Sequence, residues 1–191
     1  MSLVVAYKRD GIIYMGADTQ SSRGYSIERT LNESGFKISR LSSGMLMGVC
    51  GRVKGHQRIL SKKCFDIPDD VVFNKRYIVK NIIPQLSDIM KDVVDENESR
   101  NSSMSVSLIV AWQGKMFMIT SRFKVLECAS YAAIGAGNDY AGYLLSSIGK
   151  SDDVNEGLLK ALRAGANFDS SVSAPFVLID TKDREYKIIE G

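Results

Sequence analysis

The order of apolar runs and amphipathic segments is the feature that most constrains how this chain of 191 residues can fold. Short β-branched and apolar runs bounded by turn residues come in groups, and helical periodicity falls between the groups. Single strands alternating with single helices would favour a parallel sheet, whereas grouped strands favour stacked sheets with helices outside them. The sequence therefore predicts an α+β fold built on stacked sheets with helices outside them.

The expected strands are short and are separated by turn signals. Asp10-Gly11 and Gln113-Gly114 each lie between two such runs, a pattern that is typical of hairpin turns. Strands are expected at residues 3–8, 12–17, 36–41, 45–50, 106–112, 115–120, 126–134, 176–179 and 186–189.

Helices are expected between these groups of strands. Over residues 74–98 apolar side chains recur every three or four positions, which predicts a long amphipathic helix. Pro84 should kink this helix or restart it, because proline lacks the N–H group that a helix interior needs. Shorter helices are expected at residues 52–63, 140–148 and 154–166.

Composition narrows the class of protein. A hydrophobic content of 45% and a charged content of 25% fit one globular domain, which we expect to span residues 1–191. Basic and acidic residues, 25 and 22 in number, are spread along the chain, so we expect no nucleic-acid partner. No stretch approaches the roughly 20 apolar residues that cross a bilayer, so we expect no membrane partner.

Cysteine usage and the two ends give two further expectations. Cys50, Cys64 and Cys128 are an odd number at irregular spacing, which is typical of free thiols, so a cytoplasmic location is expected. Residues 1–3 and 190–191 are also typical of residues that an expression vector adds.

Four segments carry a resemblance to a known family. Residues 2–20 resemble the first two strands of proteasome β subunits and of HslV, the bacterial ATP-dependent peptidase. In that family a Thr, Ser or Cys becomes the first residue of the mature chain and an Asp follows 16 residues later, the separation of Ser2 and Asp18. Residues 36–41 resemble the segment that holds the active-site lysine of the family, here Lys37.

The other two segments are glycine turns. Residues 48–51 resemble the turn whose backbone N–H supplies the oxyanion hole, which would be that of Gly51. Residues 133–141 resemble a strand-to-helix turn in which Ala136 stands where the family usually has serine. The family's further Asp and Ser come from the loop before the last strands, and the candidates there are Asp169 or Ser170, with Ser173.

The resemblance implies a four-layer αββα sandwich of the N-terminal-nucleophile (Ntn) hydrolase type and a specific chemistry. Ser2 would be the nucleophile once Met1 is removed, with its own α-amine as the base that a weakly acidic hydroxyl needs. Lys37 would lower the pKa of both groups, and Asp18 would keep Lys37 charged and oriented. Gly51 would donate its N–H to the oxyanion. No metal or cofactor is expected, because this chemistry requires none.

The implied function is a peptidase subunit that hydrolyses unfolded polypeptides inside a homo-oligomeric ring, with an AAA+ unfoldase ATPase as partner. One alternative is a non-catalytic ring subunit, which Ala136 and the retained Met1 favour. Another is an Ntn amidohydrolase that acts on a small amide.

Each of these residues also has a plainer interpretation. Asp18 alone would be a turn cap, Lys37 a solvated strand residue and Gly51 a strand-ending glycine. We interpret His56, the single histidine of the chain, and Cys50 as structural residues.

Overall fold

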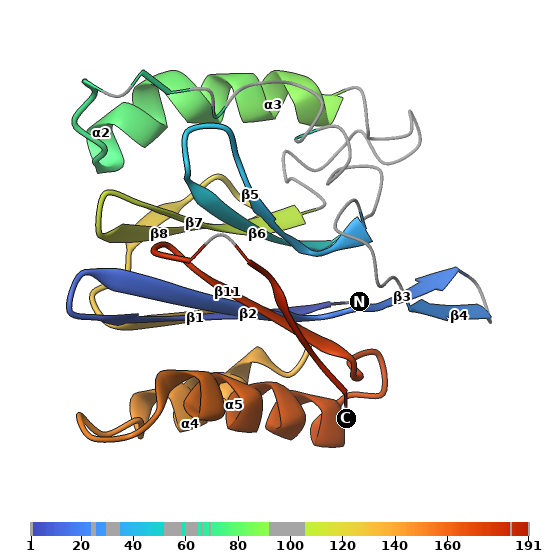
Figure 1. Ribbon diagram of the computed structural model, residues 1–191. Coiled ribbons are helices and arrows are strands. Elements are labelled where there is room, and N and C mark those ends of the chain that lie inside the picture. Colours follow the sequence, from blue (N-terminus) through green and yellow to red (C-terminus); the bar gives the residue numbers. More distant parts are fainter. Residues whose placement is uncertain are drawn as a thin grey trace.

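The computed structural model stacks four layers in the order helices, sheet, sheet, helices (Figure 1). It describes residues 2–23, 26–29, 35–51, 59, 65, 67–68, 70–91, 106–183 and 185–190. The predicted αββα sandwich is confirmed.

The first sheet has five antiparallel strands in the order β10-β1-β2-β11-β12. Its strands are β1 (Leu3–Arg9), β2 (Ile12–Asp18), β10 (Tyr131–Gly135), β11 (Phe176–Asp180) and β12 (Lys187–Ile189). The β1–β2 turn is formed by Asp10 and Gly11, which both have a positive φ, as the Asp-Gly pair predicted.

The second sheet also has five antiparallel strands, in the order β5-β6-β7-β8-β9. Its strands are β5 (Ile38–Arg40), β6 (Leu46–Gly51), β7 (Val106–Trp112), β8 (Lys115–Ile119) and β9 (Val125–Glu127). A separate hairpin of β3 (Gln20–Arg23) and β4 (Ser26–Arg29) projects beyond the sandwich (Figure 1). This hairpin was not predicted from the sequence, because its residues are mostly polar.

A tight contact at Gly48 brings the two sheets together. A Cβ atom at this position would lie 2.5 Å from Val4 Cγ1 and 3.0 Å from Met15 Sδ. Val4 and Met15 belong to the first sheet and pack with Ile38 of the second in one buried apolar cluster. Glycine is therefore required here by the closeness of the opposing sheet.

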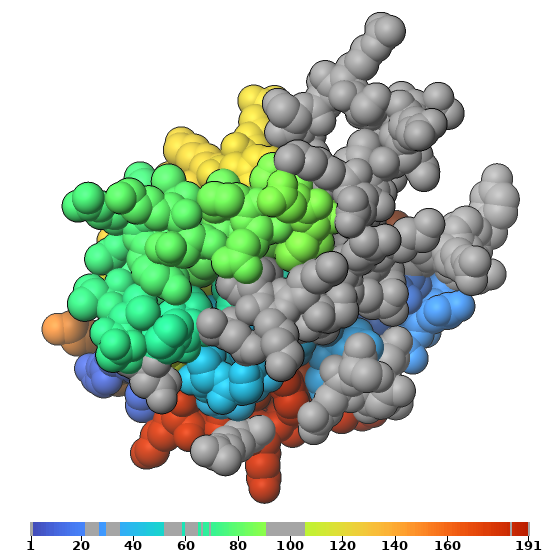
Figure 2. Space-filling view, turned by 90° about the horizontal axis from the view of Figure 1, so that it is seen from above, coloured from blue at the N-terminus to red at the C-terminus, as the bar shows by residue number. Residues whose placement is uncertain are grey.

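A continuous helical run covers the outer face of the second sheet, and Figure 2 looks down on it. The run consists of α2 (Lys75–Tyr77), the π-helical η2 (Ile78–Ile82) and α3 (Ile83–Lys91). Its buried Ile82 and Leu86 pack with Leu108 and Phe117 of the sheet below. Residues 92–98 of the predicted long helix lie outside the described residues.

The interruption predicted at Pro84 takes the form of the π-helical turn. The N–H of Ile83 donates to the carbonyl of Ile78, five residues back, and α3 begins at Ile83. Proline has no N–H and its ring crowds the preceding turn, and a wider turn relieves both constraints. Of the predicted helix at residues 52–63 the structure describes only Ile59, and His56 and Cys64 also lie outside the described residues.

The helices α4 (Asn138–Ser146) and α5 (Val154–Phe168) cover the outer face of the first sheet (Figure 1). Leu158 and Leu162 of α5 pack with Leu3 and Val5 of β1. In the described part of the chain, no helix is long and apolar enough to cross a membrane.

The prediction of one strand over residues 126–134 is wrong. The segment forms β9 in the second sheet and β10 in the first, and crosses between them at residues 128–130. The cause is that both sheets bury one face in the same apolar interior, so an apolar run does not reveal which sheet each part joins.

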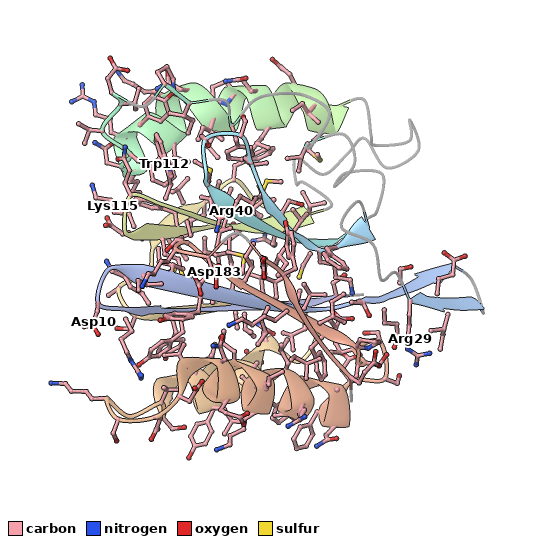
Figure 3. The ribbon with its side chains drawn as sticks, viewed as in Figure 1. Asp10, Arg29, Arg40, Trp112, Lys115 and Asp183 are labelled. Atoms are coloured by element: carbon pink, nitrogen blue, oxygen red, sulfur yellow. The ribbon has the colours of Figure 1, made fainter. Side chains whose placement is uncertain are left out.

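The loop between β11 and β12 of the first sheet contacts the second sheet at Arg40, the last residue of β5. The Arg40 guanidinium donates to the carbonyl oxygens of Asp180 and Asp183, and Figure 3 shows Arg40 and Asp183 at this junction. The hydroxyl of Tyr186 accepts from the Arg40 N–H at 3.0 Å. The Tyr186 contact satisfies one backbone N–H of β5, an edge strand of the second sheet.

We expect Gly48→Ala to lower the free energy of unfolding by about 1–3 kcal/mol, since the added methyl group overpacks the contact between the sheets. Gly142→Ala is the control, because a Cβ there meets nothing within 4 Å and alanine favours the α4 helix. Urea unfolding followed by circular dichroism measures both. Equal stability of the two variants would contradict the tight contact.

Candidate active site

The start of β1 and the end of β2 bring Ser2 next to Asp18. The N–H of Leu3, the residue after Ser2, donates to Asp18 Oδ1 at 2.8 Å. The carbonyl of Ser2 accepts from the N–H of Ala136 at 2.8 Å, and Ser2 is only 8% exposed. The 16-residue separation therefore corresponds to two strands joined by a tight turn, which return the chain to the same end of the sheet.

Asp18 and Lys37 form a buried ion pair between the two sheets. Lys37 Nζ lies 2.7 Å from Asp18 Oδ2, and the two side chains are 9% and 0% exposed. Lys37 Nζ also donates to the carbonyl of Gln20, whose N–H donates to Asp18 Oδ2 at 3.2 Å. Burial of two charges is tolerated because Asp18 accepts from three donors and Lys37 Nζ donates to two acceptors.

The environment of Asp18 acts on its acidity in two directions. Burial raises the pKa of the carboxyl above its ordinary value, because water no longer stabilises the carboxylate. The Lys37 ammonium and the N–H groups of Leu3 and Gln20 oppose this shift. A neutral Asp18 would abandon these charge-assisted contacts, so the carboxylate and the ammonium depend on one another.

The backbone around Lys37 is held by the second sheet. The carbonyl of Lys37 accepts from the N–H of Val49 in β6 at 2.8 Å. Its neighbours Phe36 and Ile38 are buried in the apolar cluster between the sheets. The ammonium therefore reaches Asp18 from a firmly packed segment.

Gly135 and Cys50 shape the surroundings of Ser2. Gly135 has a φ of 97°, and a Cβ there would lie 1.9 Å from the carbonyl oxygen of Ser2 and 2.7 Å from Cys50 Sγ. The Cys50 thiol donates to the carbonyl of Ile134 at 3.2 Å. Gly51, which follows Cys50, ends β6 with a φ of 136°. The oxyanion role of Gly51 stays a prediction.

The loop that holds Asp169, Ser170 and Ser173 lies against the end of β2. Gln20 Nε2 donates to the carbonyl of Ser170 at 3.1 Å, so the loop does meet the Asp18 region. The Asp169 carboxylate is engaged within its own turn, where it accepts from the N–H and the hydroxyl of Ser171. These two donors lower the pKa of Asp169.

Ser173 is placed differently from the other two. Its hydroxyl accepts from Arg29 Nε at 3.3 Å and donates to the carbonyl of Ala174 at 3.2 Å. The structure thus brings together Ser2, Asp18 and Lys37 and adds this loop at their side. The catalytic roles of Asp169, Ser170 and Ser173 stay predictions.

Gln20 and Arg29 contact the candidate residues and the loop but were not predicted from the sequence. Gln20 follows the expected second strand closely, and its burial in a polar segment had no sequence signal. Arg29 lies in the hairpin that was not foreseen. Among the described residues, no group of three or more His, Cys, Asp or Glu side chains is placed to hold a metal ion.

Comparisons by sequence find no relative, since no family model and no curated protein match. Comparison of structures finds several. BPH from Thiobacillus denitrificans is 20% identical, with 93% of this chain and 96% of that chain covered and a TM-score of 0.76. Anbu (ancestral beta-subunit) from Yersinia bercovieri is 14% identical, with 98% and 86% covered and a TM-score of 0.70.

HslV from Trypanosoma brucei is 16% identical, with 93% of this chain and 98% of that chain covered and a TM-score of 0.67. The likeness extends over nearly the whole chain in all three cases, and at these identities it is evidence about architecture. The chain therefore has the proteasome-like Ntn-hydrolase fold that the sequence resemblance implied.

Proposed function

We propose that this chain is an N-terminal-nucleophile peptidase whose nucleophile is Ser2. The observation that carries the proposal is the buried Asp18–Lys37 pair, whose carboxylate also accepts the N–H of the residue after Ser2. A buried ion pair contributes little net stability, because desolvation offsets the attraction. Its position at the start of β1 is better explained by a need for positive charge beside a nucleophile.

The proposed reaction proceeds through a seryl ester. Ser2 Oγ bonds to the carbonyl carbon of the scissile peptide while its proton passes to the Ser2 α-amine, which removal of Met1 has freed. The C–N bond then breaks, and the departing amine takes the proton. Water, deprotonated by the same α-amine, hydrolyses the ester, releases the acid and restores the hydroxyl.

Lys37 and Gly51 contribute through electrostatics. The Lys37 charge lowers the pKa of the hydroxyl and of the α-amine, so that more of the amine is in its basic form at neutral pH. The Gly51 N–H would stabilise the oxyanion, and the loss of one such donor typically costs about 100- to 1000-fold in rate. Asp169, Ser170 and Ser173 would support the Ser2 end of the site.

The likeness to proteasome-like subunits supports a proposal for the assembly and the substrate. Anbu from Pseudomonas aeruginosa forms a helical assembly, and we propose that this chain likewise associates with itself, as a ring around enclosed sites. Its substrate would be unfolded polypeptide in the cytoplasm. An AAA+ unfoldase ATPase would supply it, because folded proteins do not enter a closed chamber.

A non-catalytic ring subunit is the second candidate. Ala136 favours it, because this residue contributes its backbone N–H to the Ser2 carbonyl but has no hydroxyl to add to the site. An amidohydrolase for small amides is a third candidate and would need an enclosed substrate pocket. The retained Asp18–Lys37 pair favours the peptidase over the ring subunit.

Epoxomicin tests the nucleophile, since BPH from Thiobacillus denitrificans binds it and its epoxyketone needs both a hydroxyl and a free α-amine to close a ring. We expect intact-mass spectrometry to show loss of Met1 and one adduct per chain, mapped to Ser2. Ser2→Ala, which still permits removal of Met1, should give no adduct. Retained Met1 without an adduct in the parent protein would favour the non-catalytic subunit.

Removal of both buried charges tests the ion pair. Lys37→Met alone leaves Asp18 buried and unpaired at a cost of about 3–5 kcal/mol, whereas Lys37→Met with Asp18→Asn should stay folded. We expect the double variant to lose at least about 100-fold in peptide hydrolysis while its thermal unfolding stays close to that of the parent. Lys160→Met on the exposed face of α5 is the control. A double variant that hydrolyses at the parental rate would remove both residues from the mechanism.

Cys50 is the rival nucleophile near Ser2, and its burial disfavours it. Burial raises the pKa of this thiol to about 12. At pH 8 roughly one molecule in 10,000 would carry the thiolate, so we expect iodoacetamide to label Cys50 only after unfolding in urea. Peptide mapping of native and unfolded samples measures this. Rapid native labelling of Cys50 would reopen it as the nucleophile.

A further inference from the structure

We propose that Gln20 and Arg29 are positioning residues that hold the Asp18–Lys37 pair and the loop at residues 169–175 in one arrangement. The inference rests on the proposed function, because it assigns these residues to the same reaction. Gln20 and Arg29 lie directly opposite one another on β3 and β4, at the base of the projecting hairpin.

Gln20 contacts the ion pair through its backbone and the loop through its side chain. Its N–H donates to Asp18 Oδ2 at 3.2 Å, and its carbonyl accepts from Lys37 Nζ. Its Nε2 donates to the carbonyl of Ser170 at 3.1 Å, and the residue is only 4% exposed. A shift of the Gln20 backbone would therefore change the contacts of both charged groups.

Arg29 holds the same loop from the other strand. Its Nε donates to the carbonyl of Ala174 at 3.0 Å and to the hydroxyl of Ser173 at 3.3 Å. Figure 3 shows Arg29 at the base of the hairpin, near the end of the molecule where α5 ends. The exposed Arg29 is thus two contacts away from the buried Lys37, through its cross-strand partner Gln20.

Hairpin and loop depend on each other for their position. A two-stranded hairpin is marginally stable by itself, and among the strands that the structure describes β3 and β4 pair only with each other. Thr19, between β2 and β3, makes a third contact with the same loop, because its hydroxyl donates to the carbonyl of Pro175 at 2.9 Å. Loss of the Gln20 or Arg29 contact would loosen the loop and let Gln20 move away from Lys37.

The test compares Arg29→Met and Gln20→Met, which keep side-chain length and remove the donor. We expect kcat to fall about 10- to 100-fold with KM changed less than about twofold, since the variants misplace reacting groups without removing a substrate contact. The thermal midpoint of Arg29→Met should stay within about 2 °C of the parent. Arg29→Lys, which keeps a donor and a charge, should recover part of kcat. Arg163→Met, on the exposed face of α5, is the control.

A second readout does not depend on catalysis. Amide hydrogen exchange by NMR reports the Gln20 N–H, which we expect to exchange at least about 10-fold faster in both variants than in the parent and in Arg163→Met. An active parent whose kcat is unchanged by Arg29→Met and Gln20→Met would overturn the positioning role. A parent without hydrolysis or adduct would refute the proposed function. In that case unchanged hydrogen exchange at the Gln20 N–H would overturn the coupling of the loop at residues 169–175 to the Asp18–Lys37 pair. Faster exchange in the variants would support this coupling.

Discussion

The stacking of the two sheets is the constraint on which the candidate site depends, because it brings Asp18 and Lys37 into a buried contact. Each charge would lose several kcal/mol of favourable hydration free energy on leaving water. The N–H groups of Leu3 and Gln20, the carbonyl of Gln20 and the ion pair itself offset this loss. Asp18 ends a strand of the first sheet and Lys37 precedes a strand of the second. The pair can therefore form only when the two sheets are stacked in the observed register.

Glycines permit the close approach that this stacking needs. Gly48 lets the second sheet pack closely against Val4 and Met15 of the first sheet. Gly135 lets the end of β10 lie against the carbonyl of Ser2. Both positions lack space for a methyl group, so the backbone itself forms part of the interior. The start of β1 is consequently held by neighbours on both sides, which is the preorganisation that the proposed nucleophile would require.

Much of the fold was predictable because its signals are local. The Asp10-Gly11 turn, the periodicity of the helices and the interruption at Pro84 each depend on residues close in sequence. The strand at 126–134 was not predicted correctly, because its two halves join different sheets and an apolar run does not show this. The β3–β4 hairpin pairs locally but was missed because its residues are mostly polar. The alignment of Ser2, Asp18 and Lys37 came from spacing within the resemblance, whereas the contacts of Gln20 and Arg29 had no such signal.

The sequence by itself determined that stacked sheets carry helices outside them, that 16 residues separate Ser2 from Asp18 and that a lysine lies beside the next strand. These properties follow from residue type and spacing along one chain. The tertiary structure alone decided that Lys37 pairs with Asp18 rather than with water, that Cys50 is shielded and that the loop at 169–175 meets Gln20. Burial and distance depend on how the two sheets and the hairpin pack, and a linear pattern does not encode that packing in any short segment.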